Sequence, residues 1–302
     1  MLKKVIKWTL IVLGSIIIIV AVIIYGLISS SNKKMNKKWE VTPASIPIPP
    51  DSASVARGEH LAGVFCMDCH GDQFQGKTMI DDPDIGKIEA HNLTSGKGGV
   101  GGKYTDVDWV RAIRHGINKD GRALFIMPAN AMHNLCESDV ADIVAYMKTI
   151  PPVDHVVQER PQITKMAKVL AAIGAFGDVW SAESIDHDAA FEVAPASGPT
   201  SEYGEYLVNS IGCRHCHGEQ LNGGKSPEPH APFVPNLTPG GDLGTWSNEQ
   251  FTKVLRTGWL PNGRQLSPQY MPWKATSRMS DDEITAIYEY LKKLPKLETA
   301  KE

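Results

Sequence analysis

Residues 66–70 read CMDCH and residues 213–217 read CRHCH, so the spacing C-x-x-C-H occurs twice. This spacing is typical of a c-type haem attachment site. Two thiols three positions apart on a tight turn can each form a thioether with a haem vinyl group, and the following histidine then becomes the proximal iron ligand. We therefore expect two covalently bound haem c groups. The expected attachment residues are Cys66, Cys69, Cys213 and Cys216, and the expected proximal ligands are His70 and His217.

Other roles of closely spaced cysteines fit less well. A structural zinc site needs a second pair of ligands near each motif, and none is well placed. A thioredoxin-like dithiol belongs in a βαβ context, which the sequence lacks. Four of the five cysteines lie in the two motifs and only Cys136 is left over, so no disulfide framework is expected. We expect Cys136 to be a small, partly buried thiol without redox function.

An apolar run without charged residues covers residues 8–28, which is long enough to span a bilayer as a helix. A cleaved signal peptide would have a shorter apolar core and a small-residue cleavage site, so residues 1–31 are predicted to be an uncleaved signal anchor. Residues 32–53 are rich in proline and predict an extended tether.

Lysines flank both ends of the apolar run, and the positive-inside rule therefore does not fix its orientation. Haem attachment takes place outside the cytoplasm, so we expect a cytoplasmic N-terminus. The remainder would then lie on the periplasmic, outer side of a bacterial cytoplasmic (inner) membrane. The net formal charge of −3 gives no reason to expect nucleic acid as a partner.

The rest of the chain repeats itself. The second C-x-x-C-H begins 147 positions after the first, and other shared pairs follow at offsets of 142 to 144. These pairs are Asn92-Leu93-Thr94 with Asn236-Leu237-Thr238, Arg114 with Arg256, Gly121-Arg122 with Gly263-Arg264, and Met127-Pro128 with Met271-Pro272. A duplicated domain explains them. We predict domain one at residues 54–152, a connector with a short helix at 153–200, and domain two at 201–302.

Each copy has the pattern of helices joined by long loops. Apolar stripes of helical period cover residues 140–150 and 284–294, and a proline follows each. Capping boxes are predicted at Thr105, Ser247 and Ser280. First helices should lead into each haem motif. No stretch alternates well enough to predict a strand, so the predicted fold class is all-α.

Each copy resembles a class I cytochrome c domain. Gly58 stands eight positions before Cys66, Gly204 stands nine before Cys213, and aromatic residues occupy the last helices at Tyr146 and Tyr290. The resemblance implies that each glycine lets the first and last helices cross closely against such an aromatic. It also implies two tandem domains of this class behind the N-terminal transmembrane helix.

A narrower resemblance covers about two-thirds of the chain. The run from Asn236-Leu237-Thr238-Pro239 to Met271-Pro272 is similar to the cytochrome subunits of membrane-bound bacterial alcohol and sugar dehydrogenases. Many members of that group have three haem motifs where this chain has two, and the N-terminal anchor also differs. The resemblance implies redox partners such as a membrane-bound dehydrogenase, a quinol-oxidising complex or a terminal oxidase.

A low-spin electron carrier needs a second axial ligand on each iron, and a methionine thioether raises the reduction potential relative to a second histidine. Met127 and Met271 lie where class I cytochromes place this ligand, and both precede a proline. Met132 is the alternative in copy one, but Thr276 stands at its position in copy two. The histidines that could also ligate iron are His91, His115, His133 and His230.

Other residues have more than one possible role. Arg114 and Arg256 are candidates for hydrogen bonds to haem propionates. The Asn-Leu-Thr triplets fit a glycosylation sequon, but we expect them to shape the loop beside each haem. Within the connector, Met166, Val169, Leu170, Ile173 and Phe176 form an apolar helical face. This face is expected to pack against one or both haem domains.

These patterns predict a membrane-anchored dihaem cytochrome that passes single electrons in a bacterial respiratory or dehydrogenase-linked chain, and not an enzyme. One alternative is a dihaem enzyme, such as a peroxidase or a thiosulfate-oxidising cytochrome. A peroxidase would need one haem with an open sixth site. A second alternative is a haem sensor or structural subunit.

Overall fold

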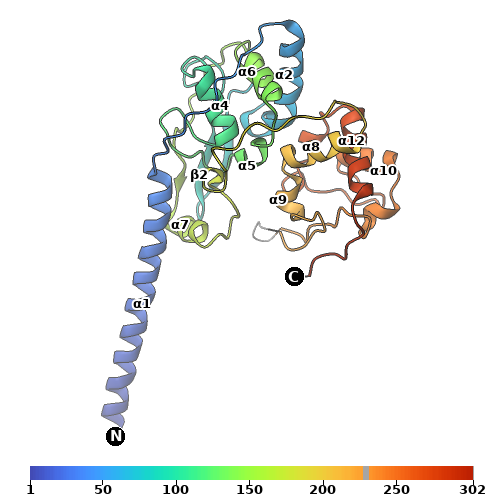
Figure 1. Cartoon of the computed structure of the whole chain (residues 1–302). Coiled ribbons are helices and arrows are strands. Elements are labelled where there is room, and N and C mark those ends of the chain that lie inside the picture. The colour runs from blue at the N-terminus through green and yellow to red at the C-terminus, as the bar shows by residue number, and fades with distance from the viewer. Residues whose placement is uncertain (227–230, 302) are drawn as a thin grey trace.

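The computed structural model describes residues 1–226 and 231–301 (Figure 1). A long helix, α1 (Leu2–Asn36), leads into two clusters of shorter helices. The first cluster contains α2 (Ser52–Phe65), α3 (Met67–His70), α4 (Asp106–His115), α5 (Ala129–Met132) and α6 (Glu137–Met147). The second contains α8 (Ser201–Ile211), α9 (Cys213–His217), α10 (Asn248–Thr257), α11 (Trp273–Thr276) and α12 (Asp281–Lys293). The connector contributes α7 (Lys165–Ala172) and a short 3₁₀ turn, Ser181–Glu183.

The first and last helices of each copy cross at a glycine. A Cβ atom added to Gly58 would lie 1.9 Å from the backbone oxygen of Asp142 and 2.9 Å from Cβ of Tyr146. At Gly204 the same atom would lie 1.9 Å from the backbone oxygen of Ala286 and 2.9 Å from Cβ of Tyr290. The expected close crossing against an aromatic is therefore confirmed in both copies.

The predicted capping boxes are present. The hydroxyl groups of Thr105, Ser247 and Ser280 accept the backbone N–H of the third helical residue, and that residue's side chain bonds back to the cap. Cys136 occupies the cap of α6, where Ser280 caps α12, but its thiol makes no such bond. Its backbone N–H donates instead to the hydroxyl of Tyr206, 3.1 Å away.

The all-α prediction is wrong in copy one. Strands β1 (Lys77–Asp82), β2 (Gly86–Ala90) and β3 (Gln162–Ile163) form a small antiparallel sheet in the order β1-β2-β3. Ile88 is the buried side chain of the hairpin. A hairpin this exposed has no hydrophobic alternation for a sequence pattern to detect. Its turn is closed by Asp82, whose carboxylate accepts the backbone N–H groups of Asp84 and Ile85.

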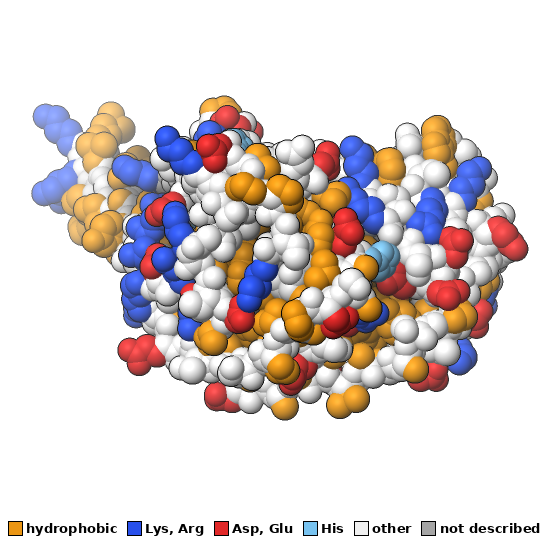
Figure 2. Space-filling view, turned by 90° about the horizontal axis from the view of Figure 1, so that it is seen from above, with side chains coloured by type: hydrophobic (Ala, Val, Ile, Leu, Met, Phe, Trp, Pro, Cys, Tyr) orange, Lys and Arg blue, Asp and Glu red, His pale blue; other side chains and the backbone are white. Residues whose placement is uncertain are grey.

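Helix α1 projects from the body of the molecule, and its apolar side chains and distant lysines stand clear of it (Figure 2). Among the described residues, it is the helix that is long and apolar enough to cross a membrane. It continues to Asn36, past the predicted end of the anchor. The segment after it lies on copy one, where the backbone N–H of Trp39 donates to Gly121 O and Ile46 is buried in the core.

The connector lies mainly on copy one and on α1. Strand β3 extends the sheet of copy one, and α7 packs against α1. The apolar face of the connector was predicted to pack against the haem domains. Phe176 does pack in a cluster with Phe125 and Ile126 of copy one, but Met166 and Ile173 stay exposed and the buried side of α7 packs against α1, which is a correction. The reason is that α1 continues beyond the apolar run and offers a nearby helical surface.

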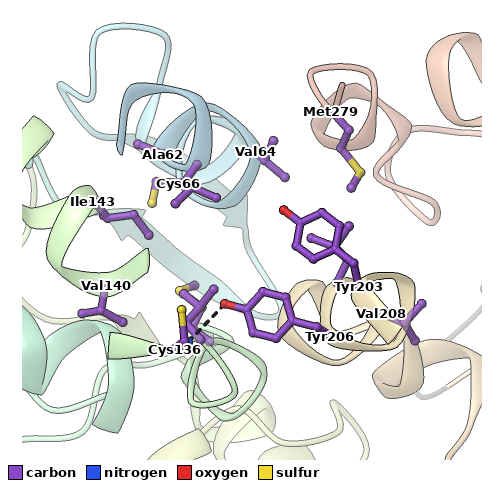
Figure 3. Packing of buried hydrophobic residues seen from close by; sticks show 14 of the residues in the cluster. Ala62, Val64, Cys66, Cys136, Val140, Ile143, Tyr203, Tyr206, Val208 and Met279 are labelled. Carbon is purple, nitrogen blue, oxygen red and sulfur yellow. Dashed lines mark hydrogen bonds between the residues drawn. The ribbon is translucent and has the colours of Figure 1, made fainter. Parts of the chain in front are cut away.

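The two copies share one hydrophobic core. Tyr203 and Tyr206 of α8 stack with their ring centroids 6.0 Å apart and lie between the copies, close to Val64, Cys66 and Cys136 of copy one (Figure 3). Met279 of copy two joins the same cluster. The copies are therefore packed against each other and are not separate bodies on a flexible connector.

Two equivalent polar pairs cross this interface, and the two copies exchange roles between them. His60 of copy one lies 2.8 Å from the carboxylate of Glu283 in copy two, and Tyr206 of copy two donates to Asp139 of copy one over 2.6 Å. His60 and Tyr206 each stand two positions after the crossing glycine, and Asp139 and Glu283 are each the third residue of the last helix. This exchange is the arrangement that a two-fold axis between the copies produces.

Candidate haem-binding sites

The two C-x-x-C-H motifs have the same local geometry. Each lies on a short helix, α3 or α9, directly after the first helix of its copy. Nδ1 of His70 donates to His91 O over 2.7 Å, and Nδ1 of His217 donates to Pro235 O over 2.9 Å. A hydrogen bond of this kind orients the ring and leaves Nε2 available to bind a metal.

Burial determines the protonation states of the histidines and cysteines in the two motifs. It lowers the pKa of His70 to about 4 and also lowers the pKa of His217, so both rings are neutral near pH 7. Burial raises the pKa of Cys66 to about 12 and that of Cys213 to about 11, so both thiols keep their protons. A neutral imidazole is the form that ligates iron.

A large apolar cavity opens beside the motif of copy one. Its open volume is about 1200 Å³, including solvent at the mouth. Cys66, Cys69, His70 and Met127 all line it. Many other wall residues are apolar or aromatic, among them Phe65, Leu93, Trp109, Ile113, Phe125 and Ile143. Two thiols, an imidazole and a thioether around an apolar space fit a covalently attached porphyrin.

The backbone places Met127 and Met271 equivalently. Each precedes a proline at the N-cap of a short helix, and the two prolines have almost the same dihedral angles: φ −79° and ψ 54° at Pro128, φ −77° and ψ 56° at Pro272. The Met127 carbonyl also accepts a hydrogen bond from Ser181 of the connector. The repeat seen in the sequence is thus also a repeat of conformation.

Met132 lines the same cavity as Met127, so the structure brings both candidates of copy one to the site. Met132 is buried and belongs to the core cluster. Its counterpart Thr276 donates its hydroxyl to Leu255 O over 2.8 Å, which is a structural role. Only Met127 therefore has an equivalent in copy two. Met271 packs, partly buried, against the shared core.

The other histidines that could ligate iron differ in their positions. His91 lines the cavity, and its backbone carbonyl accepts the hydrogen bond from His70. The cavity wall does not include His115 or His133; Nδ1 of His115 lies 3.0 Å from Nδ1 of His187, and Nδ1 of His133 donates to Arg114 O. His230 lies outside the described residues.

The Asn-Leu-Thr triplets form a matching pair of buried clamps. The side-chain oxygen of Asn92 accepts the backbone N–H and the hydroxyl of Thr94, while its amide donates to Val153 O over 2.8 Å. Asn236 makes the equivalent bonds with Thr238 and Leu297 O. Both asparagines are buried, so they shape the chain as expected and are poor glycosylation acceptors.

The clamps bind a segment that the sequence patterns did not connect with the site, the chain after the last helix of each copy. Each ties the loop beside the haem motif to the segment that follows the last helix. In copy one, Leu93 at the centre of the triplet lines the cavity. The only sequence signal was the common offset of the two triplets, because the clamp's partners are backbone carbonyls with no sequence signature.

Arg114 and Arg256 bind backbone carbonyls. The Arg114 guanidinium donates to His133 O over 2.7 Å and to the carbonyls of Ala189 and Ala190. The Arg256 guanidinium donates to Ser277 O over 2.6 Å and also to Met279 O. Both arginines therefore fasten the chain just after the loop that carries Met127 or Met271 (the methionine loop), and their role at the propionates stays a prediction.

These features define the class of the protein as a c-type cytochrome. Residues 55–151 match the family model described as "Cytochrome c", and residues 200–291 match the model described as "Cytochrome C oxidase, cbb3-type, subunit III". Each match contains one C-x-x-C-H motif. The chain belongs to the c-type cytochromes and carries two covalently bound haem c groups.

Among c-type cytochromes, the chain is similar to several curated proteins. The chain is 28% identical to the fructose dehydrogenase cytochrome subunit of Gluconobacter japonicus over 85% of its length and 55% of that protein's. It is 29% identical to the gluconate 2-dehydrogenase cytochrome c subunit of Pantoea cypripedii, over 81% of its length and 60% of the relative's. A "Diheme cytochrome c-type" from Cereibacter sphaeroides is 26% identical and aligns over 90% and 88% of the two lengths. The chain thus spans little more than half of the dehydrogenase subunits.

Proposed function

We propose that this chain is a membrane-anchored electron carrier with two His/Met haems, and not an enzyme. Two class I cytochrome c domains, at residues 54–152 and 201–302, would each hold one haem. The haem supplies one-electron redox chemistry, and the protein sets its potential, exposure and docking. His70 and Met127 would hold the first iron, and His217 and Met271 the second.

The contact between the first haem motif and the second methionine loop carries the proposal that the two haems form a relay. Helix α11 begins two residues after Met271 and contacts both α2 and α3 of copy one. Arg278, shortly after α11, forms an ion pair of 2.7 Å with Asp68 inside the first motif. The first haem motif and the chain just after Met271 therefore meet at one interface, which favours electron exchange within the chain.

The relatives suggest the partner. Two of them are named as cytochrome subunits of fructose and gluconate dehydrogenases. By analogy, a membrane-bound dehydrogenase would donate electrons to this chain; a quinol-oxidising complex or a terminal oxidase would be other redox partners. Helix α1 would cross the cytoplasmic membrane with the haem units on the periplasmic side, where c-type haem attachment takes place.

The test is the visible spectrum of the purified holoprotein and of Met127→Ala, Met271→Ala and Met132→Ala. A charge-transfer band at long wavelength reports sulfur ligation to ferric haem. We expect the first two variants each to lose about half of this band, because each removes one of two thioether ligands. Met132→Ala is the matched control from the same cavity and should keep the band.

Two results would contradict the proposal. If Met132→Ala loses the band and Met127→Ala keeps it, the ligand of copy one is Met132. If the unmodified protein contains one high-spin haem and turns over peroxide, the dihaem enzyme replaces the electron carrier.

A further inference from the structure

Helix α7 presents an apolar edge that nothing in the described chain covers. Met166 and Ile173 are both 60% exposed, although they are large hydrophobic residues. They stand seven positions apart on one side of the helix, with Val169 and Leu170 half-buried between them. Neighbouring exposed apolar side chains are typical of a surface that contacts another protein, a ligand or a membrane.

The opposite side of α7 is tied to α1. Ala167 and Ala171 are buried, and such small residues allow a neighbouring helix to approach closely. The hydroxyl of Ser31 in α1 donates to Lys168 O over 2.6 Å, and Ser31 is fully buried. Figure 1 shows α7 beside the upper part of α1, on the edge of copy one that faces along α1 towards the N-terminus.

This attachment fixes the depth of α7 relative to a membrane. Ser31 lies three residues beyond Ile28, where the apolar run ends, which is about 4.5 Å along a helix. The polar layer on each side of the hydrocarbon core is roughly 5–7 Å thick. Leu27 and Ile28 are already partly buried, whereas residues 16–26 of the run are exposed. Contacts with the body of the protein thus begin inside the apolar run.

The charges around this edge suit lipid headgroups. Lys33 of α1 stands two positions after Ser31 and is exposed, as is Lys165 in the first turn of α7, while Lys168, whose backbone carbonyl accepts the bond from Ser31, is half-buried. Lysines at this depth interact favourably with anionic lipid phosphates, while apolar side chains of the same helix enter the acyl boundary.

We propose that α7 is a second membrane contact. It lies in the headgroup layer on the side where α1 emerges from the membrane towards the haem domains, and it places Met166 and Ile173 against the acyl chains. This inference rests on the proposed membrane anchoring by α1. A single helix would let the haem units rotate about its axis, but a second contact fixes their orientation. Copy one, with its cavity, would then present a constant side to partners in the same membrane.

The experiment uses the full-length holoprotein in nanodiscs of phosphatidylcholine and phosphatidylglycerol in equal amounts. The probe is a phosphatidylcholine with a photoactivatable diazirine next to the glycerol backbone, and adducts are mapped by mass spectrometry. We expect adducts on residues 8–28 and on α7. In Met166→Ser/Ile173→Ser, adducts on α7 should fall severalfold, while adducts on α1 and the haem spectrum stay unchanged.

Val193 is the matched control, because this connector residue is 92% exposed but lies outside α7, and it should remain unlabelled. Labelling of α1 without labelling of α7 would overturn the inference and leave the anchor intact. Equal labelling of α7 and Val193 would also overturn it, since the adducts would then reflect exposure alone. If α1 itself is unlabelled, the anchor and the inference both fail.

Discussion

At the scale of the residue, two glycines decide how closely the helices of each copy approach. The space beside Gly58 and Gly204 is filled by the backbone of the opposing helix, which cannot move away without separating the two helices. Gly63 lies in the same helix as Gly58, but the nearest atom to an added Cβ there is 3.7 Å away and belongs to the flexible side chain of Arg278.

We predict that Gly58→Ala destabilises the protein by at least about 1–3 kcal/mol, because the new methyl group overlaps a backbone carbonyl. Gly204→Ala should have the same effect in copy two. The measurement is the free energy of unfolding from urea titration. Gly63→Ala is the control and should be neutral or slightly stabilising, since alanine favours the helix. Equal losses at Gly58 and Gly63 would show that the crossing is not the cause.

At the scale of the element, the irregular segments are held by buried side chains. The Asn92 and Asn236 clamps join loops to the chain that follows α6 and α12, segments about 60 positions away in sequence. Arg114 and Arg256 fasten the opposite loop in the same manner. Each haem motif therefore sits between two helices and two anchored loops, which together keep the site rigid.

We predict that Asn236→Ala destabilises copy two by about 2–4 kcal/mol, because it leaves buried donors and acceptors of the clamp without partners. Thermal unfolding followed through the haem absorbance would measure it. Asn222→Ala is the control: Asn222 is more exposed and donates once to the same terminal segment, at Glu298 O. That variant should lose less than about 1 kcal/mol. A larger loss at Asn222 would refute the clamp.

At the scale of the whole molecule, the interface between the copies contains one pair that responds to pH. The hydrogen bond from His60 to Glu283 raises the pKa of His60 above its usual 6.5. Burial alone would raise the pKa of Glu283, but its bonds with His60 and with the cap of α12 lower it overall. In the equivalent pair, burial raises the pKa of Tyr206 well above its usual value, so its hydroxyl keeps its proton and donates to Asp139.

We predict that the stabilisation by His60 is present at pH values below 6.5 and is lost as the pH rises through its raised pKa. On the acid side it is lost below about pH 4.5, as Glu283 takes up a proton. His60→Gln should therefore cost about 0.2–1 kcal/mol at mildly acidic pH, since the pair is partly exposed, and nothing at alkaline pH. Urea unfolding across this range is the measurement.

Tyr206→Phe is the control for this pH dependence. It removes the bond to Asp139 and should destabilise the interface by a similar amount at every pH in the range, because the Tyr206 hydroxyl stays protonated throughout. If His60→Gln shows the same loss at acidic and alkaline pH, the charge on His60 plays no part in joining the copies.

Most of the candidate site could be predicted from the sequence, because its signals are local. The two C-x-x-C-H motifs and the capping boxes each depend on residues within a few positions of one another, whereas the helix crossing at the glycines was implied by the resemblance to class I cytochromes c. The repeat then selected Met127 over Met132, although both line the cavity. The iron-ligand roles themselves stay predictions. The exposed hairpin β1–β2 was missed, since its stability comes from backbone pairing and leaves no hydrophobic pattern.

The sequence by itself determined the haem chemistry, the duplication and an apolar helix long enough to span a bilayer. Only the tertiary structure decided how these parts lie together: His60 with Glu283 across 223 positions, and Ser31 with Lys168 across 137. The physical reason is that covalent attachment, helix capping and apolar periodicity are encoded in neighbouring residues. Contacts between distant segments depend on the shapes of surfaces that exist only after the chain has folded.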